Sequence, residues 1–297
     1  MLSGAWWAVM AGIGFGVFQS VNRRAVDGMD VYLATFLQLL VSAVVLAAVS
    51  LLTEDLTLLA SVSISAAINF SLAALFHFFI GWTLMNLSQK RIGAARTSPL
   101  VSTAPLFAAG IAALTLQEFP TRLSLIGIVM MIAGVYAVSN QSEPADNAVP
   151  AGGWRGSLFG LAAAGCWAVS PIFIREGLKD LPSPLLGVTI GITATVPAYG
   201  VVLLWQRQQK RSLATTTDAL LFKIIAGVLV GLSTWMRWVA LDLAPVAVAL
   251  ALTLVSVPVV ILLSPLVAGK HQERVTATIW IGAGLIVGGA LLLILIP

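Results

Sequence analysis

The chain has 297 residues, of which 59% are hydrophobic and only 9% charged, and its mean hydropathy is +0.99. A soluble domain carries about 25% charged residues, so these values exclude a surface made for water and favour one made for a lipid bilayer. The net charge of +4, with no run of more than two Lys or Arg, argues against a nucleic-acid partner, and a single cysteine, Cys166, excludes an intrachain disulfide.

The apolar segments have the length of transmembrane helices. A bilayer core about 30 Å thick needs roughly 20 apolar residues per helix, whereas barrel strands are about ten residues long with strict polar alternation. We expect the first segment to be retained, because Arg23 and Arg24 follow the apolar run, the reverse of a signal peptide. The predicted fold is an all-α membrane protein with about ten transmembrane helices. In chain order the expected spans are 3–22, 31–52, 64–87, 95–116, 122–140, 155–174, 184–205, 219–241, 245–268 and 276–296.

A duplication is predicted around the polar segment SNQSEPADNAVPAGG at residues 139–153, near the midpoint of the chain. Four residues in each half share the same spacing: Glu118, Thr121, Gly127 and Gly134 in the first, and Glu273, Thr276, Gly282 and Gly289 in the second. Trp82 and Pro105 have counterparts 153 residues later, in Trp235 and Pro258. We therefore expect one five-helix repeat over residues 1–140, a polar linker over 141–154 and a second repeat over 155–297.

Helix number and charge both predict that the two halves are inverted relative to each other. Five is an odd number, so a duplicated half enters the membrane with the opposite orientation. Of the 16 Lys and Arg residues, 12 follow odd-numbered helices and four follow even-numbered ones. The positive-inside rule places the odd-numbered connections in the cytoplasm. The chain is thus expected to cross the cell membrane, the inner membrane in a bacterium, with both termini outside.

Two related segments carry a resemblance to a known family. PLFAAGIAALTLQEFPTRLSLIG runs from Pro105 to Gly127, and PVVILLSPLVAGKHQERVTATIWIG runs from Pro258 to Gly282. Each holds a proline in the fourth helix of its half, then an acid in the connection, then a glycine in the fifth helix. This pattern resembles the ten-helix, EamA-like branch of the drug/metabolite transporter superfamily, and the sequence Gly-Cys-Trp at residues 165–167 is similar to that family's first-helix motif.

The resemblance implies two inverted five-helix repeats around a central cavity that opens alternately to either side. It also implies that both termini face the cytoplasm, which is the opposite of the orientation that the charge count predicts. Substrates of that family include amino acids, sugars, nucleotide precursors and drugs, so the resemblance leaves the cargo open. A lysine common near the end of the family's first helix is replaced by Arg24 and Arg175, and its role does not transfer.

The most polar stretch at membrane depth is WMRWVALDLAP, near the end of the predicted eighth helix. Trp235, Trp238 and Asp242 fall on one helical face, where a carboxylate and two indoles could hold a polar or cationic solute. The alternative is an interfacial tryptophan belt, with Arg237 extended toward the membrane surface and Asp242 in the loop.

Other polar residues within the predicted helices have two interpretations each. His77 is either a proton relay or a neutral histidine bonded to a neighbouring helix, and Asn69, two turns earlier, favours the first. Gln19 either lines the cavity or bridges helices beside a seam formed by Gly12 and Gly16.

The second half and the tryptophans complete the set of candidate residues. Ser170 precedes Pro171, which either opens a substrate site or only kinks the sixth helix. Glu118 and Glu273 are expected at helix starts in structural roles, and GxxxG pairs such as Gly284 and Gly288 in helix packing. The candidate substrate-binding residues are Gln19, Asn69, His77, Trp82, Trp167, Ser170, Trp235, Arg237, Trp238 and Asp242.

The function predicted is secondary transport of small metabolites, with export of amino acids as one option. The partners expected are a small solute and the bilayer, with proton coupling through His77, no cofactor, no metal and a monomeric chain. The alternative is an intramembrane enzyme acting on a lipid-like substrate, which would need two or more acids or histidines facing one another. A helical subunit without transport activity is a third reading, which the inverted repeat argues against.

Overall fold

The computed structural model describes residues 2–27, 29–60, 62–92, 100–139, 153–208, 215–267 and 277–295. Residues 141–152 of the predicted linker and Glu273 lie outside them, whereas the last two linker residues, 153 and 154, begin helix α9. The described part is helical, as predicted, with one isolated antiparallel bridge between Met29 and Thr215. The first half contains α1 (Leu2–Asp27), α2 (Val31–Thr53), α3 (Thr57–Ala60), α4 (Ile64–Ala74), the π-helix η1 (Leu75–Gly81), α5 (Trp82–Ile92), α7 (Ala104–Thr115) and α8 (Arg122–Ser139). The second contains α9 (Gly153–Asp180), α10 (Pro184–Gln208), α11 (Thr217–Leu243), α12 (Val246–Leu252), the 3₁₀ turn η2 (Thr253–Val255), α13 (Ser256–Val267) and α14 (Ala277–Leu295).

Eight segments of the described chain are long and apolar enough to cross a bilayer. They are Leu2–Asn22, Tyr32–Thr53, Ile64–Met85, Gly156–Asp180, Pro184–Gln206, Thr217–Leu243, Val246–Leu263 and Ala277–Leu295. Two shorter apolar helices, Ala104–Thr115 and Arg122–Val138, lie where the fourth and fifth spans were predicted. The sixth predicted span ended at residue 174, but α9 continues to Asp180, so Arg175 and Lys179 belong to the helix and not to a connection.

The fourth helix of each predicted repeat is interrupted just before its proline. In the first half, a turn at Ser102 and Thr103 precedes α7, and Pro105 is the second residue of that helix. In the second half, η2 separates α12 from α13, and Pro258 is the third residue of α13. Proline lacks the N–H that would continue the helical hydrogen bonds, so it is tolerated at such helix starts.

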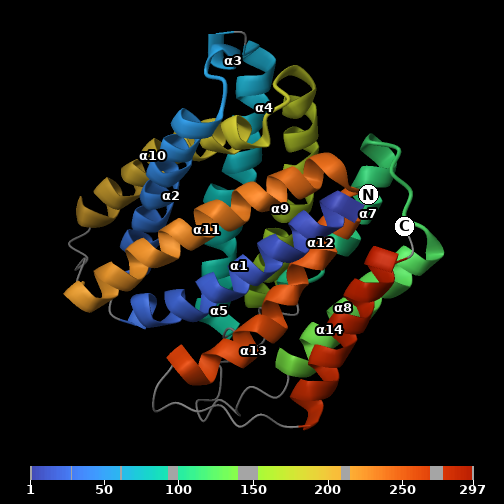
Figure 1. The fold of residues 1–297 in the computed structure, drawn as a ribbon. Coiled ribbons are helices and arrows are strands. Elements are labelled where there is room, and N and C mark those ends of the chain that lie inside the picture. Colours follow the sequence, from blue (N-terminus) through green and yellow to red (C-terminus); the bar gives the residue numbers. More distant parts are fainter. Residues whose placement is uncertain are drawn as a thin grey trace.

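The two repeat-related helices α8 and α14 pack against each other side by side (Figure 1). A Cβ added to Gly134 would lie 2.5 Å from the carbonyl oxygen of Gly282, and one added to Gly289 would lie 2.6 Å from that of Gly127. The backbones therefore meet at the glycines of the repeat motif, and the helices run antiparallel. The expectation for Gly284 was wrong, because a Cβ there would meet nothing within 4 Å.

Helix α1 lies between α11 and the interrupted helix α12–η2–α13 (Figure 1). Its glycines allow this close approach. Gly12 lies against the backbone of Leu252 and Thr253, and Gly16 against Val259, so the predicted glycine seam is a helix contact.

One end of the bundle is densely packed and carries both chain termini. Gly4, near the N-terminus, lies against Ala244, and Leu293, near the C-terminus, lies against Gly127. At this end every residue of α12 is buried, and the fully buried Phe70 of α4 fits against Gly177 and Gly187.

Candidate functional site

A buried pair of polar side chains, His77 and Arg237, joins the two halves of the chain inside the bundle. His77 is 6% exposed and Arg237 is 7% exposed. The Arg237 Nη2 lies 2.8 Å from His77 Nε2 and 3.3 Å from Nδ1. A guanidinium only donates hydrogen bonds, so the imidazole must turn an unprotonated nitrogen toward it. The structure therefore contradicts the alternative in which Arg237 extends toward the membrane surface.

Aromatic side chains from three helical segments lie around this pair. Trp167 stacks on His77 with ring centroids 5.5 Å apart, and Trp82 meets Trp167 edge-on at 6.4 Å. Phe18 contacts Trp82 at 6.0 Å, and Phe15, one turn earlier on α1, lies 5.5 Å from the Arg237 guanidinium carbon. We call this set the ring site: Phe15, Phe18, His77, Trp82, Trp167 and Arg237.

Local backbone features position the ring site. His77 lies in the π-helix η1, whose wider turns change the helical register between α4 and α5. Gly81 closes η1, and a Cβ there would lie 2.5 Å from the indole nitrogen of Trp167, so glycine lets that indole lie on the helix. The same nitrogen donates to the carbonyl oxygen of His77 at 3.1 Å, which fixes the indole beside the imidazole.

Two hydrogen-bond donors of the ring site have no partner. The Nε of Arg237 and the Nε1 of Trp82 are buried and lack an acceptor among the described residues. No carboxylate of the described chain forms an ion pair with Arg237. Yet Phe15, Trp82 and Trp167 are only partly buried. The ring site therefore has spare donors, a positive charge and aromatic rings that are not fully covered.

Sequence reasoning missed a second buried cation, Lys223, which it counted among the loop charges. Lys223 lies in α11 and is 2% exposed. Its Nζ donates to Asn22 Oδ1 at 2.5 Å and to Gln38 Oε1 at 2.8 Å, so it links α11 to α1 and α2. The only signal in the sequence was a lysine flanked by apolar residues in LLFKIIAG.

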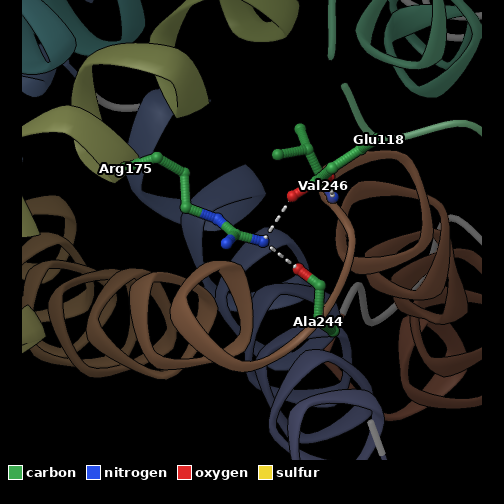
Figure 2. Close-up of polar contacts among 4 residues, drawn as sticks. All are labelled: Glu118, Arg175, Ala244 and Val246. Carbon is green, nitrogen blue, oxygen red and sulfur yellow. Dashed lines mark hydrogen bonds and ion pairs between the residues drawn. The ribbon is translucent and has the colours of Figure 1, made fainter. Parts of the chain in front are cut away.

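An ion pair closes the interface between the halves at the densely packed end. Figure 2 shows Arg175 of α9 reaching both Glu118 and the carbonyl of Ala244. The Arg175 Nη2 is 3.0 Å from Glu118 Oε1 and donates to the Ala244 oxygen at 2.6 Å. Glu118 Oε2 accepts from the Val246 N–H at 2.8 Å. Both side chains are 23% exposed.

The prediction that Glu118 interacts with the start of the helix that follows it, α8, was wrong. Thr121 caps α8, since its Oγ1 accepts from the Ser124 N–H at 3.1 Å. Glu118 instead reaches the first residue of α12. The residue before it, Gln117, has a φ of 57°, a left-handed conformation that is uncommon outside glycine and that turns the chain sharply after α7.

A surface cavity of about 400 Å³ lies beside this ion pair. Its polar lining includes Glu118, Arg175, Glu176, Lys179 and Asp242. Asp242 is exposed in the last turn of α11 and so belongs to this outer cavity rather than to the ring site or to a loop.

The structure brings together only some of the predicted site residues. His77, Trp82, Trp167 and Arg237 lie in the ring site. Trp235 contacts Trp7, and the buried Trp238 contacts Phe70, so the predicted face of two indoles and a carboxylate does not converge on one point.

The remaining three candidates lie outside the ring site. Gln19 is exposed. The Asn69 Nδ2 donates to Ser65 Oγ on its own helix at 3.4 Å. Ser170 is buried and donates to the Ala73 carbonyl of α4 at 3.0 Å, and α9 continues unbroken through Pro171.

Apolar helices of bilayer length around a buried polar site define a multi-pass integral membrane protein. The chain matches the EamA-like transporter family over residues 2–140 and again over residues 154–295, and it belongs to that family. One solved crystal structure of a protein has the same fold, with a TM-score of 0.74 and 18% sequence identity, over 98% of this chain and 95% of the other. No curated protein matches the chain.

Proposed function

We propose that this protein is a secondary transporter that moves a small metabolite past the ring site by alternating access between two inverted repeats. Members of the EamA-like family are membrane transporters of small molecules. The observation that carries the proposal is the buried pair of His77 and Arg237, because each half supplies one partner. A site at the junction of two repeats can be exposed to either side when the halves rock against each other.

The contact between α8 and α14 supports the inverted arrangement over residues 1–140 and 155–297. Gly127 corresponds to Gly282 in the repeat, and Gly134 corresponds to Gly289. The observed contacts are Gly127 with Gly289 and Gly134 with Gly282, so each contact is the repeat-related image of the other. Such reciprocal contacts between antiparallel helices are what a two-fold axis lying in the membrane plane would produce. With the interrupted fourth helices, they favour ten membrane segments over eight.

Charge supports an orientation with the densely packed end outside. The helix ends that flank the connections carrying most Lys and Arg, such as the ends of α5, α10 and α13, lie at the opposite end of the bundle from the ion pair of Glu118 and Arg175. Lys223 and Arg237 are buried and can be left out of the count of Lys and Arg. One residue is then removed from those after odd-numbered helices and one from those after even-numbered helices, so the excess after odd-numbered helices remains. We propose that both termini face outward and that the outer end is closed in this conformation by the ion pair and by α12.

The ring site also offers a route to proton coupling. A proton on His77 would replace the acceptor that faces Arg237 with a donor and place two cations in contact. The Arg237 side chain would then have to find another partner. An intramembrane enzyme is less well supported, because its two candidate groups are separated: His77 is buried, whereas Asp242 lies exposed more than one turn beyond Arg237.

The test is uptake by purified protein in proteoliposomes. Vesicles would be incubated with a defined mixture of amino acids, organic acids, sugars and amines, washed and analysed by mass spectrometry. The proposal expects accumulation of at least one solute by wild type and loss of that accumulation in the Arg237→Gln variant. Vesicles that accumulate nothing beyond protein-free controls, with the protein folded, would contradict it.

A further inference from the structure

The unpartnered donors of the ring site indicate the chemistry of the solute. Arg237 is buried with a positive charge that no described carboxylate balances, and its Nε lacks an acceptor. Burying a cation without a counter-charge is costly, especially at membrane depth. A ligand that brings a negative charge would remove this cost, whereas a cationic ligand would add to it.

The second unpartnered donor, on Trp82, also favours a ligand with a negative charge. The indole nitrogen of Trp82 usually finds a hydrogen-bond partner when buried, yet here it has none among the described residues. Trp82 and Arg237 are linked through Trp167 and His77, and each also contacts a phenylalanine of α1. Two N–H donors without acceptors suit a carboxylate, whose oxygens only accept when it is ionised.

The walls of the ring site define the rest of the ligand. The ring site contains four aromatic rings, and three of them, Phe15, Trp82 and Trp167, remain partly exposed. Aromatic faces favour a flat apolar body by stacking or edge contacts. The only other ionisable side chain in the set, His77, already faces Arg237 and offers no negative charge for an ammonium group.

We propose that the ring site binds organic carboxylates with an aromatic or apolar body and prefers them to amino acids and amines of the same shape. Arg237 Nε and Trp82 Nε1 donate to the carboxylate, and the rings of Phe15, Trp82 and Trp167 hold the body. This inference rests on the proposed transport function and names the class of its substrate.

Three solutes with one aromatic body separate the possibilities: 3-phenylpropionate carries only a carboxylate, phenylalanine carries a carboxylate and an ammonium, and phenethylamine carries only an ammonium. Their binding to wild-type protein in nanodiscs would be measured by calorimetry. We expect 3-phenylpropionate to bind most tightly, phenylalanine about tenfold more weakly, and phenethylamine not at all, given the size of charge-assisted hydrogen bonds. Because this comparison uses wild type, it does not depend on any variant folding.

Variants then assign the donors. Arg237→Gln should weaken 3-phenylpropionate binding by about 10- to 100-fold, and Trp82→Phe, which keeps a ring but removes the N–H, by about threefold to tenfold. The controls are Arg122→Gln, an exposed arginine at the start of α8, and Trp235→Phe, a half-buried indole that contacts Trp7 instead. Neither control should change binding.

The inference is overturned if phenethylamine binds as tightly as 3-phenylpropionate, if none of the three solutes binds, or if Trp82→Phe and Arg237→Gln leave binding unchanged. Proteoliposome uptake distinguishes this failure from failure of the proposed function. If an amine or a sugar accumulates and 3-phenylpropionate does not, the proposed transport function is supported and the assignment of a carboxylate substrate is wrong. Accumulation of no solute at all would contradict the transport function itself.

Discussion

Glu118 and Arg175, which come from different halves of the chain, meet at 3.0 Å and together hold the backbone where α11 gives way to α12. Arg175 donates to the Ala244 carbonyl (Figure 2), and Glu118 accepts from the Val246 N–H. The pair therefore does more than neutralise two charges. It gives hydrogen-bond partners to a carbonyl at the end of α11 and to an N–H at the start of α12, which are groups that a helix leaves without partners.

Replacing Glu118 should destabilise the protein in a way that exchanging the charges cannot repair. We expect Glu118→Ala to lower the free energy of unfolding by about 1–3 kcal/mol, because it removes charged hydrogen bonds from a partly buried site. The exchange of Glu118→Arg with Arg175→Glu restores a possible ion pair but offers Val246 a donor in place of an acceptor, so stability should stay low. Unfolding in detergent would be followed by fluorescence.

The matched control for that experiment is Glu176→Ala. Glu176 pairs with Lys179 at 2.6 Å, but the two side chains are 40% and 65% exposed. Its loss should change stability by less than about 0.5 kcal/mol. Recovery of wild-type stability by the charge exchange would show that only the ion pair matters.

The glycine contact between α8 and α14 gives a second prediction. Gly134→Ala would place a Cβ 2.5 Å from the Gly282 oxygen, so the helices must separate and the unfolding temperature should fall by several degrees. Gly284→Ala lies on the same helix pair but meets nothing within 4 Å, and it should be neutral or stabilising, since alanine favours helix by about 1 kcal/mol over glycine. Equal effects of both substitutions would contradict the packing described here.

His77 gives a prediction about pH. An unprotonated ring nitrogen is required to accept from Arg237, so protonation at low pH should disturb the ring site. His77→Gln keeps an acceptor that does not titrate, and we expect it to flatten the dependence of transport on pH in the acidic range. His271→Gln, the only other histidine, is the control and should leave the profile unchanged. If folded His77→Gln protein shows the same dependence of transport on pH as wild type, His77 has only a packing role.

Lys223 can be tested with a double-mutant cycle. Gln38→Leu removes one of the two oxygens that the buried ammonium contacts, and it should cost about 1–3 kcal/mol of stability. Lys223→Met in the same protein removes the cation that needs the oxygen, so part of this loss should be recovered. Additive losses in the double variant would show that the contact contributes nothing.

The sequence allowed good prediction of features that depend on short-range pattern. Helix positions followed from apolar segments of bilayer length, and the repeat spacing identified Gly127, Gly134, Gly282 and Gly289, which prove to be the contact points of α8 and α14. The prolines at equivalent positions of both halves were part of the repeat pattern, but the interruption of the fourth helices beside them was not predicted. The predicted features are local, because chain length and spacing act within one or two helices.

The features that escaped prediction depend on contacts between distant segments. His77 lies in a π-helix, which a count of 3.6 residues per turn does not predict, and Asn69 bonds to Ser65 on its own helix. The pairing of His77 with Arg237 spans 160 residues, and that of Glu118 with Val246 spans 128. Nothing in local composition distinguishes a lysine at a helix end from Lys223, which is buried by two other helices.

Alternating access requires the two halves to separate at the interface of Glu118 and Arg175 during each transport cycle. Cys166 is the only cysteine, so Cys166→Ser gives a background in which Glu118→Cys and Arg175→Cys can be joined by a short bifunctional thiol reagent with a reducible link. Uptake by proteoliposomes would be measured for a solute that wild type accumulates, before cross-linking, after it, and after reduction. We expect cross-linking to stop uptake and reduction to restore it. Undiminished uptake by fully cross-linked protein would show that the halves do not separate at this interface.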